Sequence, residues 1–169
     1  MRELDRVKNL IELLILCHPR GFSILLGEAE APSLREIHEI MSSQRVPMPE
    51  DFKPTTINTE TEAERIIYDS EYFDKSVKLA GGWAHIHSVS NEFRNADTRM
   101  WSIVVDHVKF VGNALTRNTS QLTRVAHKYG ISRNTVSRYR RGFSVKLGKM
   151  LLMPTTDNFY LTIRQTMSW

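Results

Sequence analysis

The residues best equipped for chemistry in this sequence are cations and short polar side chains between residues 122 and 141. Arg133, Asn134, Ser137 and Arg138 recur at spacings that place them on one side of a helix. Arginine presents a planar fork of donors that fits O6 and N7 of guanine, and asparagine fits N6 and N7 of adenine. The chemistry that this segment offers is therefore hydrogen bonding to base edges and phosphate oxygens.

The charge of the chain is unevenly distributed. The net charge is +4, but residues 1–90 carry 10 Lys/Arg against 15 Asp/Glu, and residues 91–169 carry 13 against 4. Ten basic residues and no acidic residue lie between His107 and Thr156. The positive electrostatic potential of such a stretch raises the local concentration of a polyanion. A basic face that only meets solvent has the same composition, so charge alone leaves both interpretations open.

The positions around this segment fit two helices that meet at a steep corner. Such a corner needs a small residue where the helices approach, a glycine that can turn left-handed, an apolar plug, a cap for the second helix and two residues that return to the core. The sequence supplies them in one register as Ala126, Gly130, Ile131, Ser132, Val136 and Tyr139.

The run from Tyr129 to Tyr139, Tyr-Gly-Ile-Ser-Arg-Asn-Thr-Val-Ser-Arg-Tyr, resembles the turn and recognition helix of helix-turn-helix transcription regulators. The resemblance implies that Arg133, Asn134, Ser137 and Arg138 approach bases in the major groove of double-stranded DNA. A helical hairpin that only imitates the motif is the alternative. The residues expected to hold phosphates are Ser120, Arg124, Lys128, Arg140, Arg141 and Lys146.

The layout of the chain is similar to that of phage late-gene regulators of the Q antiterminator kind, whose helix-turn-helix resembles sigma-factor region 4. The features shared are the short length, the late position of the motif and the basic helix after it. The resemblance implies a sequence-specific transcription regulator of bacterial or phage type that acts with RNA polymerase. This chain lacks the zinc-binding cysteines that some antiterminators carry. A module that tethers replication, packaging or segregation machinery to DNA is the alternative function.

The apolar periodicity predicts an all-α fold. The segment Phe22 to Leu26 fits a strand or a helical turn, and the alternation in 83–90 permits a short strand, although a buried connection fits it equally well. Ser33 with Glu36 forms a predicted capping box. The predicted helices cover 3–18, 34–42, a segment led by Thr59 and Glu62 that runs to Leu79, 97–117, and the two helices of the motif, of which the second continues to Leu151.

Three regions are expected. Residues 1–90 form an acidic helical region for protein contacts, interrupted by a proline-rich linker over 45–58. Residues 91–153 form the DNA-binding domain, and the apolar tail 154–169 docks on the body or on a partner. The expected partners are double-stranded DNA and RNA polymerase, with a homodimer as a further option.

No enzyme activity, cofactor or metal site is predicted. The sequence shows no glycine-rich phosphate loop and no acidic cluster suited to two metal ions. His85, His87 and His107 lack a placed carboxylate or thiolate, and the single Cys17 excludes an internal disulfide. No apolar run is long enough to cross a bilayer. These observations predict a cytoplasmic, nucleoid-associated protein.

Overall fold

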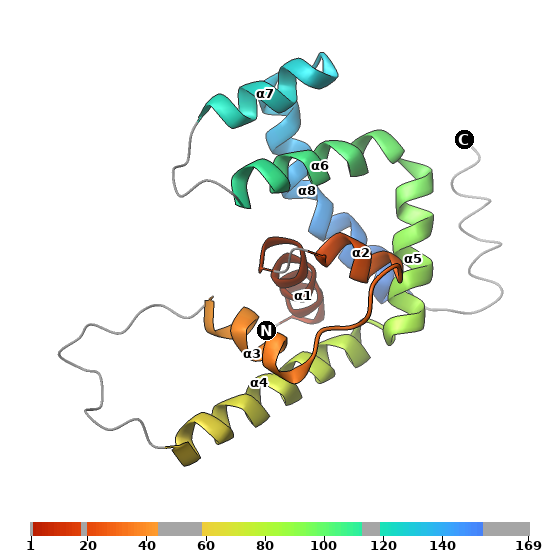
Figure 1. The fold of residues 1–169 in the computed structure, drawn as a ribbon. Helices are drawn as coiled ribbons and strands as arrows, with labels where there is room; N and C mark the ends of the chain where they lie inside the picture. The colour runs from red at the N-terminus through yellow and green to blue at the C-terminus, as the bar shows by residue number, and fades with distance from the viewer. Residues whose placement is uncertain (1, 18–19, 44–58, 113–118, 154–169) are drawn as a thin grey trace.

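A computed structural model describes residues 2–17, 20–43, 59–112 and 119–153 (Figure 1). The described residues form eight α-helices and no strand, which confirms the predicted all-α fold. The predicted linker 45–58, the predicted tail 154–169 and the expected extension of the 97–117 helix beyond Gly112 lie outside the described residues. The helices are α1 (Glu3–Cys17), α2 (Gly21–Leu26), α3 (Leu34–Ser43), α4 (Thr59–Leu79), α5 (Trp83–Ala96), α6 (Thr98–Gly112), α7 (Thr119–Tyr129) and α8 (Arg133–Leu152).

The segment over 83–90, where a short strand was permitted, is part of helix α5. Ile86, Val89 and Phe93 are buried at spacings of three and four, which is the helical period. The alternation in the sequence arose from His85 and His87, which do not belong to that buried stripe. The Phe22 to Leu26 segment is likewise helical and lies within α2.

Two predicted helix starts are confirmed by their hydrogen bonds. The Ser33 N–H donates to Glu36 Oε2 at 2.8 Å, and the Glu36 N–H donates to Ser33 Oγ at 3.3 Å. This reciprocal pair is the capping box that begins α3. Asp97 begins α6, because its Oδ1 accepts the Met100 N–H at 3.0 Å. Both caps satisfy N–H groups that have no partner inside the helix.

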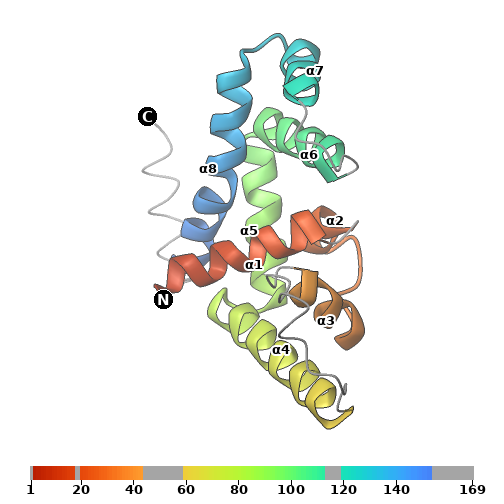
Figure 2. The ribbon, with the colours of Figure 1, turned by 90° about the vertical axis from the view of Figure 1, so that its left-hand side faces the viewer.

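The main core joins the first helices of the chain to the last. α1 packs against α8, which runs from the corner beside α7 to the level of α1 (Figure 2), and Val7, Ile11 and Leu14 of α1 are buried in this core. Phe143 of α8 lies at the centre, with its ring edge-to-face against Phe22, Phe93 and Trp101 at centroid distances of 5.3–5.9 Å. Residues of the expected acidic region 1–90 and residues of the expected DNA-binding domain 91–153 therefore share one core.

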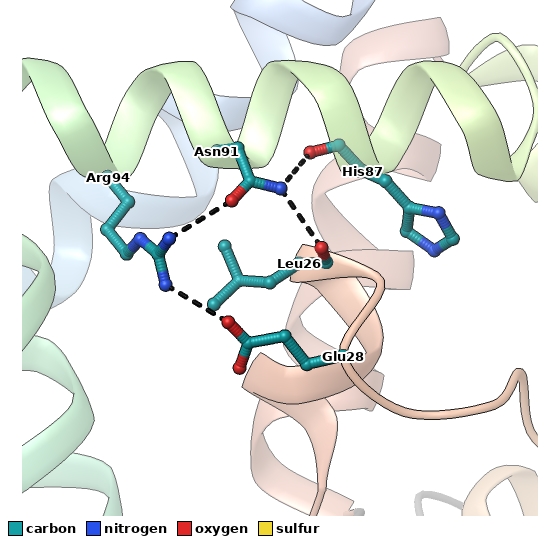
Figure 3. Close-up of polar contacts among 5 residues, drawn as sticks. All are labelled: Leu26, Glu28, His87, Asn91 and Arg94. Atoms are coloured by element: carbon teal, nitrogen blue, oxygen red, sulfur yellow. Dashed lines mark hydrogen bonds and ion pairs between the residues drawn. The ribbon is translucent and has the colours of Figure 1, made fainter.

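The end of α2 is fastened to α5 by a polar network (Figure 3). The Asn91 side-chain amide donates to the carbonyl of Leu26 at 3.0 Å and to that of His87 at 2.8 Å. Arg94 donates to Asn91 Oδ1 at 3.1 Å and forms an ion pair with Glu28 at 3.4 Å. Asn91 thus satisfies a carbonyl that the C-terminus of α2 leaves without a helical partner.

Among the described residues, no helix is long and apolar enough to span a membrane.

Candidate nucleic-acid interface

The corner between α7 and α8 has the predicted glycine geometry. Gly130 adopts φ +64°, and its N–H donates to the carbonyl of His127 at 3.3 Å. The Ile131 N–H donates to the carbonyl of Ala126 at 3.0 Å. This pair of bonds is the Schellman arrangement, in which a left-handed residue ends a helix and turns the chain away from it. Gly130 therefore separates two helices and does not lie inside one.

Ser132 begins α8 as predicted. Its backbone is extended, and its Oγ accepts the Thr135 N–H at 3.1 Å. The Thr135 hydroxyl lies 2.9 Å from the same Oγ. Because the cap fixes where the helix starts, Arg133 and Asn134 occupy its first turn.

A small second core holds α6, α7 and α8 together. Ile103 of α6, Val125 of α7 and Val136 of α8 are each 0% exposed, and Ala126 lets the helices approach closely. The partly buried side chains around this core are Leu122, Tyr129, Ile131 and Tyr139. The corner and the first turns of α8 lie at one end of the molecule, with α6 beneath α7 (Figure 2). The positions expected from the sequence to reach the core do reach it.

The left-handed backbone of Gly130 predicts that its replacement by alanine lowers the stability of the fold. A Cβ at Gly130 would meet no atom within 4 Å, so Gly130→Ala adds only the strain of a left-handed backbone, about 1 kcal/mol of stability lost. Gly142 is the matched control, because it lies inside α8 and an added Cβ would meet only Met100 Cε at 4.0 Å. Gly142→Ala should gain up to about 1 kcal/mol. Urea denaturation measures both, and two changes of the same sign would contradict this account of the corner.

The four side chains expected to meet bases lie on the first two turns of α8. Arg133, Asn134 and Arg138 are exposed, and Ser137 is half-buried. The Arg138 guanidinium lies 5.9 Å from the ring centroid of its neighbour Tyr139. Within the part of the chain that the structure describes, none of these side chains forms an ion pair. The structure thus brings these positions together on one accessible face.

The residues expected to hold phosphates differ in their surroundings. Arg124, Arg141 and Lys146 are exposed, and nothing in the described part of the chain pairs with them. Lys128 is 60% exposed but contacts a carboxylate, since its Nζ lies 2.7 Å from Asp106 Oδ2. Ser120 belongs to α7, but its side chain lies outside the description.

Arg140 was expected to contact a phosphate, but in the structure it forms an ion pair with Glu12. Its two terminal nitrogens donate to the two oxygens of Glu12 at 3.0 and 2.7 Å, and its side chain is only 17% exposed. Ser144 donates to the same carboxylate. The reason is the crossing of α1 over α8, which brings an acidic residue 128 positions away against the arginine. Arg140 therefore fastens α8 to the body, and its guanidinium is already occupied by Glu12 and does not belong to the phosphate contacts.

The stretch between His107 and Thr156 contains no acidic residue, but two of its basic residues contact carboxylates on other helices. Glu12 of α1 contacts Arg140, and Asp106 of α6 contacts Lys128. Burial opposes ionisation of Glu12, but the hydrogen bonds from Arg140 and Ser144 outweigh it and hold the pKa of Glu12 below its usual value. Burial likewise opposes ionisation of Asp106, but Lys128 and Tyr129 lower its pKa. Burial and the bond to Asp106 raise the pKa of Tyr129 to about 12. Both carboxylates are therefore ionised at neutral pH.

Arg99 is a structural residue that the sequence patterns did not indicate. Its guanidinium donates to the carbonyl of Tyr129 at 2.9 Å, at the last residue of α7. The bond ties the start of α6 to the corner and satisfies one of the carbonyls that α7 leaves open. No local pattern could reveal it, because the two residues are 30 positions apart.

The histidines considered for metal binding are dispersed. His85 Nε2 lies 3.0 Å from the carbonyl of Leu151, and His87 stacks on Trp83 at 5.9 Å. His107 is half-buried, and burial together with the charge of Arg140 lowers its pKa. Over the described ranges, no three His, Cys, Asp or Glu side chains gather as metal ligands would.

A cavity of about 290 Å³ lies between α1, α3 and α4. Its acidic lining residue is Glu12, whose carboxylate oxygens already accept bonds from Arg140 and Ser144. The lining consists of Asn9, Glu12, Leu13, Leu16, Met41 and Tyr72. This set does not provide the paired acid and base of a hydrolytic site.

Comparison with known proteins finds no match, whether with family models, curated proteins or solved structures. The candidate interface is accordingly defined by its own geometry: a capped helix that begins at a glycine corner and exposes arginines on its first turns.

Proposed function

We propose that this protein binds double-stranded DNA in a sequence-specific manner, with the first turns of α8 in the major groove. The observation that supports the proposal best is the exposed Arg133, Asn134 and Arg138 face next to the glycine corner, where nothing described covers it. A recognition helix needs its N-terminal residues to extend beyond the body while its other side packs on a supporting helix. Here Val136 and the small core beneath it provide that support.

The proposed contacts divide into base readout and positioning. Arg133, Asn134, Ser137 and Arg138 would meet base edges, where a bidentate arginine prefers guanine. Arg124, Arg141 and Lys146 would meet phosphates, which fix register without reading sequence. Lys128 would exchange its bond to Asp106 for a phosphate. Ser120 stays in the proposed set as a residue of the first helix of the motif.

The proposed role is that of a bacterial or phage transcription regulator in the cytoplasm, and the finer proposal is an antiterminator or activator that acts with RNA polymerase. The acidic charge of residues 1–90 supports a protein partner for that region, because it disfavours contact with DNA. Affinity capture of purified RNA polymerase by the intact chain tests the finer proposal. Recovery of a helicase or terminase in place of the polymerase would favour a tethering role.

Salt dependence provides a quantitative test of the phosphate contacts. Four neutralised phosphates, one for each proposed cation, predict that the logarithm of the association constant falls with the logarithm of salt concentration, with a slope of about −4. Fluorescence anisotropy with a duplex obtained by in vitro selection measures this slope. A slope near zero between low and physiological salt would contradict the proposed contacts between the basic side chains and the phosphates.

A further inference from the structure

Helix α4 carries an exposed apolar pair on its outer face. Ile67 is 59% exposed and Tyr68 is 65% exposed, and the two are adjacent in the sequence. Their neighbours on the inner side, such as Asp69 and Phe73, are buried against the body. Large apolar side chains that stand together on a surface mark contact sites more often than isolated ones do.

The charges on the same face are separated along the helix. Glu64 lies one turn before the apolar pair, Glu71 lies one turn after Tyr68, Asp74 lies two turns after Ile67, and Lys75 and Lys78 follow toward the C-terminal end. All five are exposed, and among the described residues none forms an ion pair with them. Glu64 and Lys75 are eleven residues apart, so they share one side of the helix but stand about 16 Å from each other.

We propose that this face binds α4 of a second copy of the chain, with the two helices antiparallel. That orientation places Glu64 of each copy opposite Lys75 of the other, with Tyr68 close to Glu71 of the second copy. A parallel pair would set Glu64 against Glu64. A uniformly basic partner would meet Lys75 and Lys78, and a uniformly acidic one would meet Glu64 and Glu71. The face is therefore complementary to itself in one orientation only.

The position of α4 leaves the candidate DNA interface uncovered. α4 lies at one end of the molecule and α7 at the other in both views (Figures 1 and 2). Pairing through α4 and DNA binding through α8 are thus separate properties. The pairing does not rest on the proposed function, and it can be measured without DNA.

Sedimentation equilibrium of the intact chain tests the pairing. Because the contact is short, the dimer should be weak, with a dissociation constant of about 1–300 µM. Tyr68→Asp should weaken dimerisation at least about tenfold, because it places a carboxylate in the centre of the contact. Tyr68→Phe is the matched control and should stay within about threefold, since it keeps the ring. The exposure of Tyr68 makes both variants compatible with the fold, which circular dichroism checks.

Charge reversal identifies the orientation. Glu64→Lys and Lys75→Glu should each weaken dimerisation by at least about threefold, because a two-fold pair contains each contact twice. The double variant should return to within about twofold of the original chain. Since the two residues are too far apart to pair within one copy, only an antiparallel dimer predicts this rescue.

Three results would overturn the proposal. They are a monomer at every concentration, a dimer that Tyr68→Asp leaves unchanged, and a double reversal that adds the two losses. Anisotropy with a single DNA site, measured on the Tyr68→Asp variant, is a separate readout. If DNA binding fails there and in the original chain while the dimer results hold, the proposed function is wrong and the pairing stands.

Discussion

Arg138→Ala is expected to weaken binding to the selected DNA sequence by about tenfold to a hundredfold, which corresponds to about 1–3 kcal/mol, while binding to random duplex changes little. The reason is the position of Arg138, which is exposed on the second turn of α8 within reach of base edges. Removal of a bidentate contact to a base lowers discrimination more than it lowers the general attraction to phosphates. Anisotropy on both duplexes at one fixed salt concentration measures the two affinities.

Lys146→Ala is the matched control for Arg138→Ala. Lys146 is also an exposed cation of α8, but it lies two turns further along the helix. As a phosphate contact, it should weaken binding to selected and random duplexes by the same factor and reduce the salt slope by about one. Equal losses on both duplexes for Arg138→Ala as well would contradict its assignment to base readout.

Glu12→Gln is expected to lower the free energy of unfolding by about 1–3 kcal/mol at neutral pH. The substitution leaves the Arg140 guanidinium, which is 17% exposed, without its opposite charge. The effect should be at the lower end of what a fully buried pair shows, because Glu12 is 26% exposed and water screens the pair. Urea denaturation measures the loss.

The dependence of this loss on pH follows from the lowered pKa of Glu12. A carboxyl group whose pKa is lower in the folded state contributes stability above its unfolded pKa, near 4.5 here, and loses that contribution as the pH falls through its folded pKa. The difference between the original chain and Glu12→Gln should therefore shrink as the pH falls from 7 to about 3.

Glu39→Gln is the control for the Glu12 measurement, because Glu39 belongs to an exposed ion pair with Arg35. It should change stability by less than about 0.5 kcal/mol at either pH. A Glu12 variant as stable as the Glu39 variant would show that the contact between α1 and α8 does not hold the helix.

The parts of the candidate site that were predictable from the sequence are those that depend on neighbours in the chain. The Gly130 turn, the Ser132 cap and the return of Val136 to the core are set within a few residues, so their spacing is enough to predict them. The Ser33 and Glu36 capping box belongs to the same class. Each is a local hydrogen-bonding rule with a short range.

The contacts that sequence reasoning missed join distant parts of the chain. Arg140 was assigned to phosphates by its position in the helix-turn-helix resemblance, yet Glu12 reaches it across α1 and α8. Asp106 reaches Lys128 in the same way from α6. Such pairs depend on how helices cross, which spacing along one helix does not determine.

Helix α5 shows a segment whose secondary structure the sequence left open. The strand permitted over 83–90 came from alternating side chains, of which two were histidines. Only the structure shows that Ile86 and Val89 face the core while His87 stacks on Trp83. Short apolar segments fit both periods, and tertiary packing decides between them.

The most direct test of the central claim is methylation interference on the selected duplex. Methylation of guanine N7 places a methyl group in the major groove, where the proposed arginine contacts would be. If α8 reads the major groove, methylation at two or more guanines of the site blocks binding, and Arg138→Ala abolishes the effect at one of them. Interference confined to adenine N3 in the minor groove, or none at any guanine, would show that α8 does not read the major groove.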